Sequence, residues 1–158
     1  MKQAHKIFGN IKLPGTATVG FPKPYSILSK LRILNICSKT FRTVRFMEYD
    51  EPYLIQDCSI SPFDTVIALA DLVGSSRQEG YVNWIESLNS LQRGRNFDLV
   101  KQYGLSRLQH DLLNPTEQLP QVIENKGKYY IAGDGKHRLT MAKCCGIQQA
   151  KVNVIVAQ

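Results

Sequence analysis

The spacing of apolar residues predicts that the middle of the chain is helical. Ser61-Pro62 is typical of a helix start, with proline at the first helical position, and Gly74 would end a helix that runs to Val73. The apolar residues of this helix would share one face: Phe63, Val66, Ile67, Ala70 and Val73. Three further helices are predicted, each ended by a glycine or by an Asn-Pro pair: 81–92, 98–103 and 105–113.

The C-terminal third of the chain predicts a small sheet and one more helix. Three short runs have the length and composition of strands: Gln121–Glu124, Tyr129–Ala132 and Val152–Val156. Between the last two runs, apolar residues recur every third position from Leu139, and Gly146 stands where a helix C-cap is expected. We therefore expect an α+β fold, with a small mixed sheet flanked by several helices. A chain of 158 residues with 43% hydrophobic content is sufficient for one core.

The turn before this last helix carries the clearest chemical signal. Gly133-Asp134-Gly135 contains two glycines, which permit backbone angles closed to other residues, and a helical pattern begins at Lys136. The N–H groups of a helix N-terminus can bind an anion, and Lys136-His137-Arg138 stands beside them. Cations in the first turn oppose the helix dipole. A phosphate site therefore explains this segment better than the alternative, a purely structural corner.

The segment from Leu119 to Val156 resembles the ParB/sulfiredoxin superfamily. Leu119–Glu124 is similar to the family's Pro-x-Val strand, Asn125–Lys128 to its hairpin turn, and Gly135–Arg138 to its phosphate-binding box. Upstream, Ile60-Ser61-Pro62 is a looser match to the family's opening strand. The resemblance implies a ParB/sulfiredoxin-like fold.

Departures from each branch of the superfamily narrow the implied function. Lys136 occupies the place of the sulfiredoxin cysteine, so peroxiredoxin repair is not expected. Chromosome-partitioning ParB proteins continue into a second nucleotide box and a helix-turn-helix domain beyond the position of Gln158, so their sequence-specific clamp function is not expected here. Related free-serine kinases carry Asp-Gly-His-x-Arg, whereas His137 is shifted by one position here. The chain is closest in kind to small plasmid-borne, stand-alone members, which are associated with ATP hydrolysis and DNA cleavage.

The resemblance and the residue types together suggest roles within the box. Five residues are expected to bind the phosphates of ATP or another nucleotide: Gly133, Gly135, Lys136, His137 and Arg138. Asp134 and His137 are the candidate catalytic residues, and Asp134 is also the candidate Mg²⁺ ligand. A metal site needs a second carboxylate, and the sequence does not choose among four candidates: Glu48, Asp57, Glu117 and Glu124.

Charge divides the chain into two parts. Residues 1–46 contain nine Lys and Arg residues and no Asp or Glu, although the whole chain has a net charge of +7. We expect a basic, partly extended N-terminal arm over residues 1–46 and the ParB/sulfiredoxin-like domain over residues 47–158. Four lysines of the arm are expected to contact nucleic acid: Lys2, Lys6, Lys12 and Lys23. The alternative is a solvated extension that binds nothing.

Several classes of protein are not expected. No apolar run approaches the ~20 residues that span a bilayer, and the N-terminus lacks the pattern of a secretory signal. The four cysteines show no CxxC spacing, so neither a zinc site nor a redox motif is expected. A cytoplasmic location is the simplest interpretation of these observations together. The leading hypothesis is a nucleotide hydrolase or nuclease that acts with nucleic acid. The alternatives are a non-catalytic nucleotide- or DNA-binding inhibitory module and a small-molecule, serine-like kinase.

Overall fold

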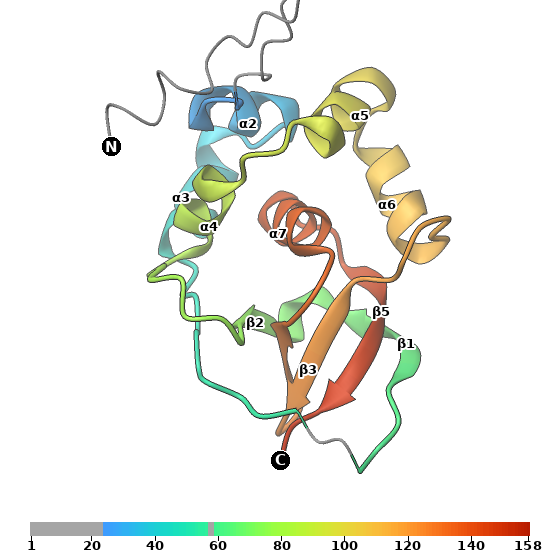
Figure 1. Cartoon of the computed structure of the whole chain (residues 1–158). Helices are drawn as coiled ribbons and strands as arrows, with labels where there is room; N and C mark the ends of the chain where they lie inside the picture. Colours follow the sequence, from blue (N-terminus) through green and yellow to red (C-terminus); the bar gives the residue numbers. More distant parts are fainter. Residues whose placement is uncertain (1–23, 57–58) are drawn as a thin grey trace, which may run out of the picture.

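The computed structural model describes residues 24–56 and 59–158, which form six α-helices and one five-stranded mixed sheet (Figure 1). The α+β class expected from the sequence is therefore confirmed. The helices are α2 (Ile27–Ile33), α3 (Ser38–Phe46), α4 (Trp84–Ser90), α5 (Arg95–Tyr103), α6 (Leu105–Leu113) and α7 (Lys136–Cys145). The strands are β1 (Phe63–Ala68), β2 (Leu72–Ser75), β3 (Gln121–Asn125), β4 (Lys128–Ile131) and β5 (Gln149–Val156).

The sheet has the strand order β1-β5-β3-β4-β2. β5 is antiparallel to β1 and parallel to β3, whereas β4 is antiparallel to β3 and parallel to β2. Val122 on β3 lies opposite Val154 on β5 and Ile131 on β4, and all three side chains are buried. The three strands that the sequence predicted in the C-terminal third are confirmed, each within a few residues of its expected ends.

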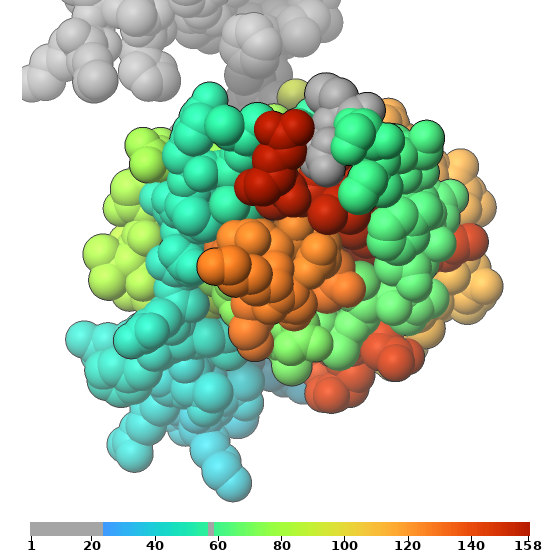
Figure 2. All heavy atoms as spheres, turned by 90° about the horizontal axis from the view of Figure 1, so that it is seen from below, coloured from blue at the N-terminus to red at the C-terminus, as the bar shows by residue number. Residues whose placement is uncertain are grey.

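The helices lie over one face of the sheet, with α7 nearest to it in Figure 1. Trp84 of α4, Phe97 of α5 and Leu139 of α7 are completely buried and belong to one hydrophobic core. On the other face, Leu54 packs against Ile123 and two neighbouring apolar residues. Figure 2 shows this side, where the teal segment before β1 runs beside the orange β3–β4 turn.

The helix predicted from Ser61 to Val73 is wrong. This part of the chain forms β1, a short 3₁₀ turn (Leu69–Asp71) and β2. The β-branched run Thr65-Val66-Ile67 favours a strand, and β1 pairs with β5 along its whole length. Phe63 and Val66, expected to be buried on a helix, are both 48% exposed. Val66 lies on the solvent face of this edge strand, opposite to the buried Ile67, and Phe63 stands at the exposed start of the strand.

The expected division of the chain at residue 46 does not follow the packing. Within residues 24–46, α2 and α3 are regular helices, and Leu34 and Val44 belong to the same core as Trp84. Lys30 is buried, and its Nζ donates hydrogen bonds to three carbonyl oxygens at the end of α4: Leu88 at 3.0 Å, Asn89 at 2.8 Å and Leu91 at 2.7 Å. This part of the expected arm is therefore integral to the domain. Lys2, Lys6, Lys12 and Lys23 lie outside the described residues, as does Asp57.

None of the helices in the described part of the chain is both long and apolar enough to cross a membrane.

Candidate functional site

The turn between β4 and α7 packs closely against Pro120 and Gln121 at the start of β3. Gly135 has a φ of 91°, and a Cβ atom there would lie 2.4 Å from Cβ of Pro120. A Cβ atom on Gly133 would lie 2.4 Å from Oε1 of Gln121. The Gln121 N–H donates to the Asp134 carbonyl oxygen at 3.0 Å, which ties the turn to the start of β3. Gly135 is therefore required by its backbone angle and by the approach of Pro120, whereas a side chain at position 133 would have to displace the side-chain amide of Gln121.

The helix that follows this turn keeps the features of an anion site. α7 begins at Lys136, as the sequence predicted, and Gly146 ends it with a φ of 80°. No side chain caps its N-terminus, and its first turn has no acidic residue. The N–H groups of that turn therefore lack a side-chain acceptor, and the helix dipole favours an anion beside them.

A cleft of about 650 Å³ lies at this helix N-terminus, and we call it the phosphate cleft. Four separate parts of the chain supply its walls: the loop after β2, the α4–α5 connection with the start of α5, the segment between α6 and β3, and the turn before α7 with the first turn of that helix. Five cationic side chains line it: Arg77, Arg93, Arg95, Lys136 and Arg138. The carboxylates that line it are those of Asp134 and Glu117. The cleft therefore carries an excess of positive charge.

Sequence reasoning missed three of these cations. Arg93 and Arg95 flank Gly94 after α4, and Arg77 follows β2. A local signal existed in the run Arg93-Gly94-Arg95, which lies in a short connection between two helices. Nothing local indicated that this connection would face α7, because that arrangement depends on the packing of α4 beside α7 in the core.

Lys136 has an intramolecular partner. Its ammonium group pairs with the carboxylate of Glu79, and it lies 5.0 Å from the ring centroid of Tyr81. The carboxylate of Glu51 accepts hydrogen bonds from the N–H groups of Glu79 at 3.1 Å and Gly80 at 2.7 Å, so the loop that carries Glu79 is held in place. A phosphate would have to compete with Glu79 for this lysine.

Arg138 also makes contacts within the protein. Its Nη2 donates to the carbonyl oxygen of Gln118 at 2.8 Å and lies 3.9 Å from Oδ2 of Asp134. The side chain is only 15% exposed. Arg138 therefore holds the segment before β3 against α7, and only the remaining donors of its guanidinium fork can bind a ligand.

His137 is half-buried, and its Nε2 accepts a hydrogen bond from the Arg93 N–H at 3.3 Å. Burial lowers the pKa of His137, and the positive charges of Arg93, Lys136 and Lys30 lower it further, whereas Asp134 opposes them. The imidazole is therefore neutral at neutral pH, and the bond from Arg93 assigns the ring proton to Nδ1. His137 fits the role of a neutral hydrogen-bond group that fixes the Arg93 loop beside the box.

The carboxylates divide into those inside and those outside the cleft. Asp134 is 64% exposed in the cleft, and Glu117 is ion-paired there with Arg95. Glu124 instead accepts from the Gly127 N–H at the β3–β4 turn, and Glu48 does not line the cleft. The described residues contain no group of three or more His, Cys, Asp or Glu side chains arranged for a metal ion. Mg²⁺ is commonly held by one or two carboxylates together with substrate phosphates, which is the contribution that Asp134 and Glu117 can make.

Comparison of this chain with protein-family models, curated proteins and solved structures finds no match. The ParB/sulfiredoxin resemblance therefore stays a prediction that rests on the residues quoted for it.

Proposed function

We propose that this protein binds the phosphate groups of a nucleotide or of nucleic acid in the phosphate cleft. The observation that carries the proposal is the convergence of five cationic side chains, from three separate segments, on one cleft at a helix N-terminus. Like charges gathered in this way repel one another, and a bound polyanion relieves the repulsion. The resemblance of Gly135–Arg138 to a phosphate-binding box supports the same ligand. A nucleic-acid partner and a cytoplasmic location remain expectations from the sequence.

The exposed arginines are better suited than the box residues to make the first contact with a phosphate. Arg77 and Arg93 are exposed, and neither side chain forms an ion pair with any described residue. Lys136 and Arg138, by contrast, already have partners in the protein. Guanidinium groups bind phosphate with two parallel hydrogen bonds.

Substitution of these arginines tests the binding function. The double variant Arg77→Gln, Arg93→Gln should weaken the binding of tripolyphosphate by roughly tenfold or more, since each charge-assisted hydrogen bond is worth about 1.5–3 kcal/mol. The control is Arg42→Gln on α3, an exposed arginine outside the cleft. Equal losses in the two proteins would contradict a phosphate site at the cleft and indicate a general charge effect.

A second candidate function is hydrolysis of a phosphate ester, and the exposed carboxylate of Asp134 inside the cleft favours it. Asp134 would orient or deprotonate a water molecule, and the neutral His137 could accept or return a proton. Bound Mg²⁺ would neutralise charge on the phosphate oxygens. A serine-like kinase would use the same groups on a different acceptor.

A measurement of turnover distinguishes an enzyme from a non-catalytic binding module. The purified protein is incubated with ATP or plasmid DNA, with and without Mg²⁺, and Asp134→Asn is compared with Asp71→Asn, which removes a carboxylate outside the cleft. An enzyme loses turnover only in Asp134→Asn and keeps its affinity for the ligand. Binding without turnover in the wild-type protein would leave the inhibitory or carrier module as the function.

A further inference from the structure

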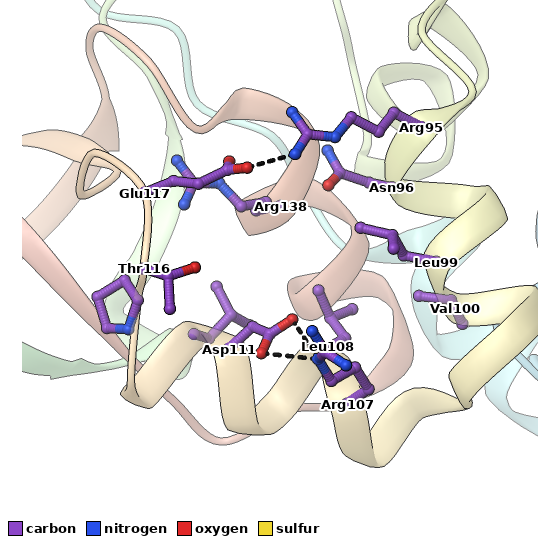
Figure 3. Close-up of a pocket in the computed structure, with 12 residues that line it drawn as sticks. Arg95, Asn96, Leu99, Val100, Arg107, Leu108, Asp111, Thr116, Glu117 and Arg138 are labelled. Atoms are coloured by element: carbon purple, nitrogen blue, oxygen red, sulfur yellow. Dashed lines mark hydrogen bonds and ion pairs between the residues drawn. The ribbon is translucent and has the colours of Figure 1, made fainter.

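A second hollow adjoins the phosphate cleft, between α5, α6 and residues 115–117 (Figure 3). Its volume is about 190 Å³. Four residues line both spaces: Arg95, Asn96, Glu117 and Arg138. The two spaces therefore share a wall at these residues, and a ligand that spans both would have to separate the Arg95–Glu117 ion pair.

The hollow has a polar ion pair at each end and apolar or small side chains between them. At the end next to the cleft, Arg95 pairs with Glu117. At the other end, Nε of Arg107 donates to both carboxylate oxygens of Asp111 at 2.9 Å. Between the two ion pairs lie apolar or small side chains, as Figure 3 shows: Leu99, Val100, Leu108 and Thr116.

The geometry of α5 and α6 keeps this space open. One residue, Gly104, joins the two helices, and its φ of 83° is a conformation that side chains other than glycine rarely adopt. This turn at Gly104 therefore sets the directions in which α5 and α6 leave it. Val100 and Leu108 lie on the sides of these helices that face the core and are buried. The hollow alone is smaller than a typical small-molecule site, but together with the adjoining phosphate cleft it reaches the size of one.

Building on the proposed function, we propose that this hollow binds the base of a nucleotide whose phosphates lie in the phosphate cleft. The half-buried Leu99 offers apolar contact to a planar ring, and the small exposed parts of Val100 and Leu108 add to it. Arg107 and Asp111 offer donors and acceptors to the polar edge of the ring. Arg95 and Arg138 stand at the junction, where the first phosphate of such a ligand would lie.

This assignment narrows the class of ligand. In duplex DNA the bases are stacked and paired, so a duplex can present phosphates to the cleft but no base to the hollow. A mononucleotide, or an unpaired nucleotide at the end of a strand, fills both spaces. We therefore expect a nucleoside triphosphate to bind more tightly than a phosphate chain of equal charge.

Calorimetric titration with two probe types tests the assignment without divalent ions. Tripolyphosphate reports on the cleft alone, whereas ATP, GTP, CTP and UTP report on the cleft and the hollow together. At least one nucleotide should bind about tenfold more tightly than tripolyphosphate, because an apolar surface buries the faces of its base. Equal affinities for all five probes would overturn the assignment and leave phosphate binding intact. If tripolyphosphate does not bind at all, the proposed function itself fails.

Substitutions that fill the hollow with a bulky side chain provide a second test of base binding. Leu99→Trp should lower the affinity of the preferred nucleotide to that of tripolyphosphate and leave tripolyphosphate binding unchanged. Thr116→Trp, at an exposed position on the opposite wall, should lower nucleotide affinity in the same way. This variant provides the test if Leu99→Trp does not fold. Gln102→Trp, exposed on α5 outside the hollow, is the control. Unchanged nucleotide affinity in a folded Leu99→Trp or Thr116→Trp variant would contradict the assignment.

Discussion

Lys136 and Glu79 form an ion pair at the start of α7, and their side chains are only 23% and 20% exposed. Glu79 thus neutralises a cation of the box, and an incoming phosphate must compete with it. The loop that carries Glu79 is held by Glu51, so the carboxylate is placed by the fold. We regard Glu79 as an internal counterion that weakens phosphate binding.

Removal of this counterion should raise the affinity of the cleft. Glu79→Gln leaves Lys136 without an anionic partner, so tripolyphosphate should bind roughly threefold to tenfold more tightly, as expected for one partly buried charge. The measurement is calorimetric titration at fixed ionic strength. Asp71→Asn removes one negative charge from the pair with Lys128, outside the cleft, and is the control. The counterion role is refuted if the two variants gain affinity equally or if neither gains any.

The neutral state of His137 predicts a loss of stability in acid. The unfolded chain takes up a proton on this histidine near pH 6.5, whereas the folded protein takes it up only at lower pH, because its pKa is lowered. The free energy of unfolding should therefore fall as the pH falls from about 7 to about 5.

His137→Gln should remove this part of the pH dependence, since the amide can still accept from the Arg93 N–H but does not titrate. His110→Gln, at an exposed position on α6, should retain it. Urea unfolding at both pH values is the measurement. An unchanged pH dependence in His137→Gln would show that His137 is not held neutral.

Two glycines with left-handed backbones allow a matched test of the turn. Gly135→Ala should lower the free energy of unfolding by about 2–3 kcal/mol, because the new Cβ adds a clash with Pro120 to an unfavourable φ. Gly127→Ala has a φ of 78° and no atom within 4 Å of the new Cβ, so it should cost about 1 kcal/mol. Equal losses would mean that the approach of Pro120 to this turn does not constrain residue 135.

The first 23 residues offer a prediction about nucleic acid. Their removal deletes Lys2, Lys6, Lys12 and Lys23 and leaves Tyr25, which packs against Phe97. If those lysines contact duplex DNA, the slope of log affinity against log salt should decrease by up to ~0.9 per lost contact. An unchanged slope would assign these residues to another role. The slope is obtained from fluorescence-anisotropy titrations of both proteins at several salt concentrations.

Local signals were sufficient for the C-terminal part of the fold. Gly135 and Gly146 stand at the two ends of α7 with left-handed backbone angles, which a glycine in the sequence indicates directly. The strands on either side of this helix are rich in β-branched or aromatic residues. Between Ser61 and Val73 the apolar residues recur at helical spacing, whereas the β-branched run Thr65-Val66-Ile67 favours a strand, so local signals support both structures. Pairing of β1 with β5, a contact across more than eighty residues, decides between them.

The candidate site was only partly predictable for a related reason. The turn and box are contiguous in sequence, so Gly133–Arg138 could be identified together. Arg77, Arg93 and the partner Glu79 reach the same place from other segments through tertiary packing. The same applies to Lys30, because no local pattern indicates that its Nζ is buried and bonds the carbonyl oxygens at the end of α4.

The central claim, that phosphate binds at the N-terminus of α7, is tested most directly by titrating ¹⁵N-labelled protein with tripolyphosphate and following the assigned backbone amides by NMR. We predict that the largest, saturable shifts occur at Gly135, Lys136, His137 and Arg138, with smaller shifts at Arg93 and Arg95 across the cleft. Such a pattern would place the anion at the unpaired N–H groups of the helix. Shifts confined to other parts of the chain, or no saturable shift at millimolar tripolyphosphate, would contradict the claim.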